Sequence, residues 1–272
     1  MGTVISAASA AALHGSAVFC DVVAGPNAKA IYTEQHVQGA VWVDLETQLS
    51  AAYIDAKDYG RHPLPQPEDF IRTLESIGIS NDSKVILYDR SSGVMAAARM
   101  WWMLRSLGHQ DVAVVDGGLK AMVEASIPIA SGEQSYASTS YQIQGSPSWQ
   151  WPLIEMEAIE SAVATGNVLV DVRAANRYAG IEEPIDPIAG HIPGAINMPL
   201  SEVLANGQFL APQALKEHFV ALAQNQVIMH CGSGVTACHS ILAMVHASYP
   251  VPTLYNGSWS QWCRNDLPRV VQ

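Results

Sequence analysis

The sequence predicts an α/β protein of two tandem domains, each a mainly parallel sheet flanked by helices. Three observations lead to this prediction: the length of 272 residues, an internal repeat, and short apolar strands that alternate with helical segments. A chain of this length exceeds the usual size of one domain. Continuous apolar strands between helices are typical of a parallel sheet that is covered on both faces.

Five blocks recur in the same order in the two halves of the chain. Residues 18–22 match 168–172, 36–40 match 191–195, 85–89 match 227–231, 92–94 match 233–235, and 114–118 match 254–258. Such a repeat indicates duplicated units. We therefore expect a domain over residues 1–132, a linker without periodicity over 133–151, and a second domain over 152–272. The offset between the halves shrinks after the second pair, which places an extra stretch within residues 47–67 of the first half.

Helical segments lie between these blocks. Residues 68–78 carry apolar side chains at helical spacing and end at a glycine, and residues 93–107 form an Ala-, Met- and Leu-rich segment that closes at Gly108. Ligands of parallel α/β sheets bind beyond the carboxyl ends of the strands. Cys231 is expected at such a position in the second half, and Asp89 in the first.

Composition limits the classes of function. The net charge is -11, with only 14 Lys and Arg residues, so the chain repels phosphate backbones and nucleic-acid binding is disfavoured. No apolar run approaches the roughly 18–20 residues of a membrane span. Four cysteines without C-x-x-C spacing do not make a disulfide framework. We expect a cytoplasmic protein that binds neither nucleic acid nor membrane.

The loop that begins at Cys231 has the composition of an anion cradle. Gly232 and Gly234 allow backbone conformations that other residues avoid, so that the N–H groups through Val235 and Thr236 can point inward. The helix that follows adds the positive end of its dipole. A cysteine at such a site favours the thiolate form, and the same loop would stabilise a second sulfur attached to it.

Cys231 has three alternative interpretations. A cysteine phosphatase needs an Arg six positions after the cysteine to hold phosphoryl oxygens, and Ala237 stands there. A zinc site is suggested by His230-Cys231 and Cys238-His239, but their spacing matches no usual finger or ribbon. A buried, inert cysteine is the third alternative, although such residues seldom lie between glycines and a helix start. Cys238 is expected to point into the core.

These residues resemble the two-domain rhodanese superfamily, closest to its 3-mercaptopyruvate sulfurtransferases. The resemblance covers almost the whole chain; its most specific element is the loop over 231–236, supported by His-x-Pro-Gly-Ala at 191–195 and Asn-Gly-Ser-Trp at 256–259. It implies two rhodanese-like domains, with the active cysteine in the second. The first domain, with Asp89-Arg90 in the equivalent place, should be inactive.

The resemblance also implies candidate substrate-binding residues. Mercaptopyruvate-preferring members carry Gly-Ser-Gly after the cysteine, as this sequence does, whereas thiosulfate-preferring members carry basic residues there. Arg177 matches the family's substrate-binding Arg, while Arg173 is either a second such residue or a structural ion-pair partner. A further substrate Arg, usual in the family's Glu-Pro-rich loop, is absent from the stretch over 182–187.

A proton relay is implied by the same resemblance. His62, in the sequence Arg61-His62-Pro63, resembles the family histidine that approaches the active-site serine, here Ser233. Glu46 or Asp44 would be the acidic partner, with Glu46 slightly favoured by spacing. His36 and His191 belong to the fold signature and are expected to orient turns by hydrogen bonds.

The predicted function is therefore transfer of a sulfane sulfur from 3-mercaptopyruvate, through a Cys231 persulfide, to a thiol, cyanide or a small redox protein. No metal or organic cofactor is required. The alternatives are a thiosulfate:cyanide sulfurtransferase on the same scaffold and a non-catalytic rhodanese-like binding module. Retention of the cysteine weighs against the last.

Overall fold

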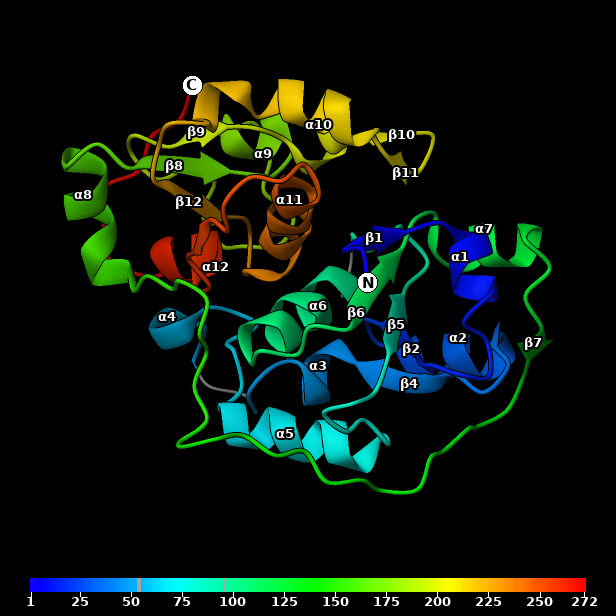
Figure 1. The fold of residues 1–272 in the computed structure, drawn as a ribbon. Helices are drawn as coiled ribbons and strands as arrows, with labels where there is room; N and C mark the ends of the chain where they lie inside the picture. Colours follow the sequence, from blue (N-terminus) through cyan, green and yellow to red (C-terminus); the bar gives the residue numbers. More distant parts are fainter. Residues whose placement is uncertain (53–54, 95) are drawn as a thin grey trace. The chain divides into compact units, whose positions relative to one another are not determined.

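The computed structural model describes residues 1–52, 55–94 and 96–272. Over these residues the chain forms two compact units (Figure 1). The first contains residues 1–52, 64–150 and 207–209, and the second contains 55–63, 151–206 and 210–272. Residues 53, 54 and 95, which fall in the predicted extra stretch and in the predicted helix over 93–107, lie outside the described residues.

The first unit is built on a five-stranded sheet in the order β1-β6-β5-β2-β4, and every pair in it is parallel. Its elements are β1 (Val4–Ile5), α1 (Ala7–Ala11), β2 (Val18–Val23), α2 (Ala28–Glu34), β3 (His36–Val37), β4 (Val41–Asp44), α3 (Leu45–Gln48), α5 (Pro67–Ser76), β5 (Val85–Tyr88), α6 (Ala97–Ser106), β6 (Val112–Val115), α7 (Gly118–Glu124), β7 (Ile129–Ala130) and β11 (Gln208–Phe209).

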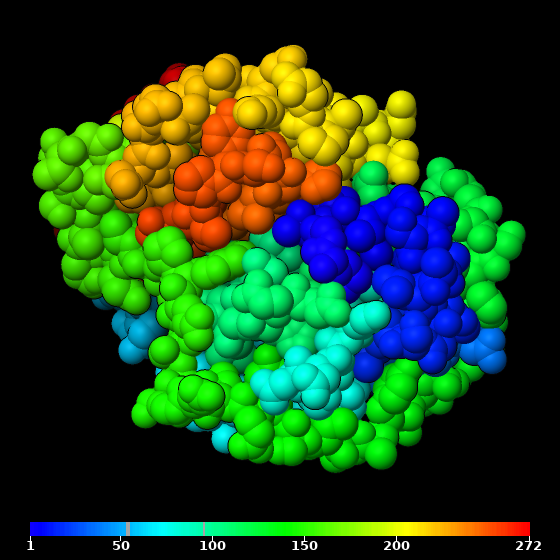
Figure 2. All heavy atoms as spheres, viewed as in Figure 1, coloured from blue at the N-terminus to red at the C-terminus, as the bar shows by residue number. Residues whose placement is uncertain are grey.

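Alternation along the strands gives this sheet two buried faces. Phe19, Ile86 and Val115 point to one face, where they form a core with residues of α1 and α7. Helix α6 contacts β2, β5 and β6. Figure 2 shows the N-terminal segment, in blue, as a continuous part of the surface of this unit. The predicted parallel sheet flanked by helices is confirmed in this half.

The second unit has a four-stranded parallel sheet in the order β13-β12-β8-β9. Its elements are α4 (Ala56–Tyr59), α8 (Met156–Ala164), β8 (Val168–Asp171), α9 (Ala175–Tyr178), β9 (Ile196–Asn197), the 3₁₀ turn η1 (Leu200–Val203), β10 (Leu204–Ala205), α10 (Pro212–His218), the 3₁₀ turn η2 (Val220–Leu222), β12 (Val227–His230), α11 (Val235–His246), β13 (Thr253–Leu254) and α12 (Ser258–Trp262).

One face of this second sheet carries the largest side chains of the unit. Leu169 and Ile228 pack there with Ile159 of α8 and with Trp259 and Trp262 of α12. Helix α11, the orange helix in Figure 1, contacts β12 and α10. Burial of two Trp side chains contributes much of the apolar area that holds this core together.

The two units repeat each other in detail, as the sequence predicts. The order β6-β5-β2-β4 in the first corresponds to β13-β12-β8-β9 in the second. His36 Nδ1 lies 2.8 Å from the carbonyl oxygen of Tyr32, and His191 Nδ1 lies 2.8 Å from that of Tyr178. Each imidazole also stacks on the tyrosine ring, with centroids 4.2 Å and 3.7 Å apart. The expected turn-orienting role of the two histidines is confirmed.

Two expectations require correction. Helix α6 begins at Ala97, not at Gly93, because Gly93 takes a φ of 81°, which a right-handed helix does not allow. The N–H groups of Gly93 and Ala96 donate to the Asp89 carboxylate. The extra stretch of the first half is also divided: residues 55–63 belong to the second unit. In the part of the chain that the structure describes, no helix is both long and apolar enough to cross a membrane.

Candidate active site

Cys231 lies where the parallel-sheet rule predicts it, directly after β12 and at its carboxyl end. Its side chain is buried, with 1% exposure. The backbone N–H of Trp259 donates to the Cys231 carbonyl at 3.1 Å. The Cys231 N–H donates to the hydroxyl of Ser258 at 3.2 Å. The start of α12 therefore fixes the cysteine on both sides of its peptide.

A side chain would be disfavoured at Gly232 and at Gly234 for different physical reasons. Gly234 takes a φ of +77°, and a Cβ atom there would lie 2.4 Å from the Asn256 carbonyl oxygen. Gly232 does not take a positive φ, so the expectation that both glycines adopt such a conformation is wrong for this one. A Cβ atom on Gly232 would instead lie 3.1 Å from Nη2 of Arg61 and 3.5 Å from Nη2 of Arg177.

The loop forms a cradle of N–H groups. Residues 231–235 are all buried, and α11 begins at Val235. Among the described residues, no acceptor forms a hydrogen bond with the backbone N–H groups of residues 232–236. Buried backbone donors nearly always have an acceptor. This cluster, at a helix N-terminus, is therefore suited to an anion on the Cys231 side chain.

His62 reaches the loop from the segment over 55–63. Its Nδ1 and the Ser233 hydroxyl share a hydrogen bond of 2.8 Å. The segment is held by the Arg61 N–H, which donates to Ser260 Oγ at 3.0 Å, and by the Asn256 side chain, which donates to the His62 carbonyl at 3.3 Å. The structure thus brings together the serine and histidine of the predicted relay.

The predicted acidic partners of that relay lie in the first unit. The Asp44 carboxylate accepts a hydrogen bond from the Thr47 hydroxyl at 2.8 Å, and Glu46 is exposed in the first turn of α3. Because the two carboxylates and His62 belong to different units, the pairing of His62 with either acid stays a prediction.

Two buried carboxylates hold two arginine side chains close to the loop. Glu183, with a side chain 2% exposed, accepts hydrogen bonds from Arg177 Nη2 at 2.6 Å and Nε at 3.2 Å. Asp186, with a side chain 0% exposed, accepts from Arg61 Nε at 3.0 Å and Nη2 at 3.2 Å. Such two-point pairs fix the plane of a guanidinium group. Both groups face Gly232 and keep N–H donors that these carboxylates do not use.

The contacts of Arg173 favour the structural one of the two roles that the sequence leaves open, and its role stays a prediction. Its side chain is 1% exposed and bonds Asp171 at 2.6 Å, Glu183 at 3.2 Å and the Gly190 carbonyl at 2.7 Å. The guanidinium also lies over the Trp259 ring, 4.8 Å from its centroid. Burial opposes its charge, but Asp171 and Glu183 raise the pKa of Arg173 above its ordinary value. These partners occupy most of its donors.

The sequence does not mark some residues of the site as functional. Arg61 stands out there only as the neighbour of His62, and Asp186 only as part of a loop without Arg. Ser258 belongs to a repeat block and carries no other signal. No local pattern marks these roles, since each depends on contacts between distant segments. Cys238 is buried, and its thiol lies 3.3 Å from the Gly234 carbonyl, in keeping with the expected structural role.

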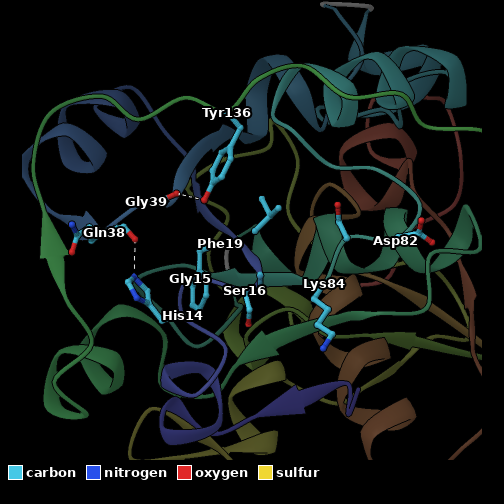
Figure 3. A pocket seen from close by; sticks show the side chains of 12 residues that line it. His14, Gly15, Ser16, Phe19, Gln38, Gly39, Asp82, Lys84 and Tyr136 are labelled. Atoms are coloured by element: carbon cyan, nitrogen blue, oxygen red, sulfur yellow. Dashed lines mark hydrogen bonds between the residues drawn. The ribbon is translucent and has the colours of Figure 1, made fainter.

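A surface pocket of about 600 Å³ in the first unit is separate from these residues. It lies beside the amino ends of β2 and β5, at the opposite end of β5 from Asp89. Figure 3 shows His14 and Tyr136 in its wall, bonded to the Gln38 and Gly39 carbonyls. None of the residues predicted for chemistry lines it.

Comparisons with known proteins identify both halves. The pattern of the Rhodanese-like domain matches residues 9–125 and 155–265. The chain is 41% identical over 239 residues to a candidate 3-mercaptopyruvate sulfurtransferase of Pseudomonas aeruginosa, covering 85% of this chain and 82% of that protein. It is 36% identical over 242 residues to SseB, a candidate thiosulfate sulfurtransferase of Mycobacterium tuberculosis, covering 87% and 83%. The solved structure of 3-mercaptopyruvate sulfurtransferase from Leishmania major superposes with a TM-score of 0.82 at 28% identity, covering 95% of this chain and 73% of that one.

The different burial of two neighbouring arginines gives a test of their roles. Arg173→Gln should lower the free energy of unfolding by about 3–5 kcal/mol, because it leaves the buried Asp171 carboxylate without its arginine and removes one of the two arginines that pair with Glu183. Arg177→Gln should cost less than half as much, since Arg177 is partly exposed and Glu183 keeps Arg173. Urea unfolding followed by Trp fluorescence measures both. Equal losses would contradict the structural role of Arg173.

Proposed function

The chain belongs to the rhodanese family, and we propose that it transfers a sulfane sulfur from 3-mercaptopyruvate through a persulfide on Cys231. The observation that carries the proposal is the cradle of N–H groups over residues 232–236, for which the described part of the chain provides no acceptor, beside a cysteine at a strand end. Preorganised donors of this kind stabilise charge that develops during a reaction. The curated relatives named for this activity support the choice of donor.

In the first step, the Cys231 thiolate attacks the sulfur of 3-mercaptopyruvate. An S–S bond forms, the C–S bond breaks, and the electron pair leaves with carbon as the enolate of pyruvate. The proton that was on the donor sulfur goes to this enolate, which gives pyruvate and an anionic Cys231 persulfide. The N–H groups of residues 232–236 would hold the outer sulfur of that persulfide.

In the second step, an incoming thiol removes the outer sulfur. The thiol sulfur attacks the outer sulfur, the S–S bond to Cys231 breaks, and Cys231 leaves as a thiolate that is again held by the loop. The products are an acceptor persulfide and the starting enzyme, which is a ping-pong sequence. Cyanide would be converted to thiocyanate in the same way. A small redox protein is a further candidate acceptor.

Ser233 and His62 would move the proton in the first step. Their 2.8 Å hydrogen bond joins a hydroxyl beside Cys231 to an imidazole. The hydroxyl can deliver a proton to the enolate and recover one from His62, and His62 would take up in its place the proton that the donor sulfur loses. Glu46 or Asp44 remains the proposed acid that would orient the imidazole.

Arg177 and Arg61 would bind the carboxylate of the donor. The loop itself carries no basic side chain, so the donor must be held from outside it. Both guanidinium groups approach Gly232 and retain unused donors, which can form charge-assisted hydrogen bonds to a carboxylate. Arg61 would therefore supply the second positive group that residues 182–187 lack.

Thiosulfate is the alternative donor, favoured by the similarity to SseB. Its terminal sulfur would be transferred in the same way, with sulfite as the leaving group, and the same two arginines would hold a dianion. We favour mercaptopyruvate because the loop between Cys231 and Thr236 is neutral. The reduced cysteines, all four of them free, support a cytoplasmic location.

A persulfide assay with both donors tests the proposal. Incubation with 3-mercaptopyruvate should add one sulfur atom to the intact mass of the wild-type protein, and thiosulfate should do so more slowly. Cys231→Ser should show no addition, while Cys20→Ser, which changes another buried cysteine, should react as wild type does. Absence of the adduct, or its persistence in Cys231→Ser, would contradict the proposal.

The relay predicts a dependence on the leaving group. Ser233→Ala and His62→Gln should each slow sulfur transfer from 3-mercaptopyruvate by about 10²–10⁴-fold, because the enolate needs a proton. The double variant should be no slower than either single variant, since the two groups act as a unit. Transfer from thiosulfate should change much less, because sulfite leaves without a proton. An equal loss with both donors would exclude the relay.

Alkylation of Cys231 tests the carboxylate site independently of sulfur transfer. Iodoacetate and iodoacetamide differ in a carboxylate, so the ratio of their rates reports recognition of that group. Arg177→Gln and Arg61→Gln should each lower the ratio by roughly tenfold or more. Arg264→Gln is the matched control. Arg264, like Arg61, pairs with Asp186, and both side chains are 23% exposed. The atoms nearest to a Cβ on Gly232 belong to Arg61 and Arg177 and not to Arg264. A similar fall in the control would mean that only the general field matters.

A further inference from the structure

We infer that Asp89 is a built-in substitute for a persulfide, whose carboxylate permanently fills the cradle of the first unit. The comparison with Cys231 rests on the persulfide chemistry proposed above. The claim that the Asp89 carboxylate fills an anion site in the first unit does not depend on that chemistry.

Asp89 and Cys231 occupy equivalent positions. Each directly follows a four-residue strand, β5 or β12. The Leu119 N–H donates to the Asp89 carbonyl at 3.0 Å, as the Trp259 N–H does to that of Cys231 at 3.1 Å. Counted from Asp89 and Cys231, the third following residue of each loop has a positive φ, 56° at Ser92 and 77° at Gly234. The loops differ at the next residue, where Gly93 has a φ of 81° and Val235 begins α11. The first part of the two loops therefore has a similar backbone.

The Asp89 carboxylate is the acceptor for its own loop. It is 2% exposed and accepts from the N–H groups of Ser91 at 2.7 Å, Gly93 at 2.8 Å and Ala96 at 3.4 Å. Burial raises the pKa of Asp89, and these donors oppose that effect by stabilising the charged form. In the first unit, the Asp89 carboxylate is thus the acceptor for loop N–H groups whose counterparts beside Cys231 have none among the described residues.

The chemistry of the two side chains accounts for the substitution. In aspartate the charged oxygen stands two bonds beyond Cβ, through Cγ. In a cysteine persulfide the charged sulfur also stands two bonds beyond Cβ, through Sγ. A cradle that accepts one can therefore accept the other. By position in the loop, the Ser91 and Gly93 donors correspond to the N–H groups of Ser233 and Val235, which are the groups expected to bind the outer sulfur.

Removing the carboxylate from the first unit should open an anion site. Asp89→Ala should lower the melting temperature by several degrees, on the order of 5 °C, because buried N–H groups lose their acceptor. Formate, a free carboxylate of suitable size, should recover at least half of that loss at saturating concentration. It should not stabilise Asp89→Asn, in which the side chain still fills the space. Asp55→Ala is the control, since it removes an exposed carboxylate that caps the Lys57 N–H.

Placing the carboxylate in the second unit tests the comparison with the persulfide. Cys231→Asp should melt several degrees above Cys231→Asn, because only the former carries an anion two bonds beyond Cβ. Wild-type protein loaded with sulfur should likewise melt above the unloaded protein, whereas the melting temperature of Cys231→Asp should not respond to the donor.

The anion site at Asp89 and the equivalence of Asp89 to a persulfide can each be contradicted separately. If formate stabilises Asp89→Ala no more than wild type and Asp55→Ala, the carboxylate does not fill an anion site. If Asp89→Ala does not fold without formate, refolding in formate against refolding in chloride decides the same point. If Cys231→Asp melts no higher than Cys231→Asn, Asp89 is not equivalent to a persulfide. Neither measurement with a Cys231 or Asp89 variant requires sulfur transfer, so a failure here leaves the proposed activity to its own tests.

Discussion

Buried backbone N–H groups require an acceptor, and the way each unit meets this requirement governs the rest of its architecture. In both units a strand ends, a loop turns its N–H groups inward, and a helix follows. The first unit supplies a carboxylate from the loop itself, at Asp89. The second places a cysteine there, and over residues 1–52, 55–94 and 96–272 the N–H groups of residues 232–236 find no acceptor. That difference separates a structural loop from one that can stabilise a charged reaction intermediate.

An acidic protein with a net charge of -11 nevertheless builds a locally positive site. It does so by burying carboxylates behind the arginines. Glu183 and Asp186 are almost fully buried, and each orients a guanidinium group that also lies close to Gly232. A surface arginine would lose side-chain entropy on binding an anion, whereas one that is already fixed loses little. The Glu-Pro-rich loop therefore serves by orienting arginines that come from other segments.

Much of the fold could be predicted from the sequence, because the strands are apolar and the repeat shows their order. The Cys231 loop and the Ser233–His62 pair were also predictable, the first from local composition and the second from a resemblance. The role of Arg61 was not, since it depends on contact with Asp186, 125 residues away. The late start of α6 was missed for a different reason. Helical composition continues through residues 93–96, but Gly93 takes a φ of 81° and its N–H donates to the Asp89 carboxylate.

The duplicated positions before α7 and α12 show how the active repeat differs beyond its thiol. Gly118 and Ser258 both have a φ of 56°, a region that favours glycine, so the serine is the strained member of the pair. Its hydroxyl accepts from the Cys231 N–H at 3.2 Å and donates to the Tyr255 carbonyl at 2.9 Å. Asp89 is anchored by its own carboxylate and needs no such help. In the proposed chemistry the outer sulfur on Cys231 would be gained and lost in every cycle, so the cysteine would have no permanent side-chain anchor and its backbone would have to be held instead. The strained φ of Ser258 is then explained by its hydroxyl, which accepts from the Cys231 N–H.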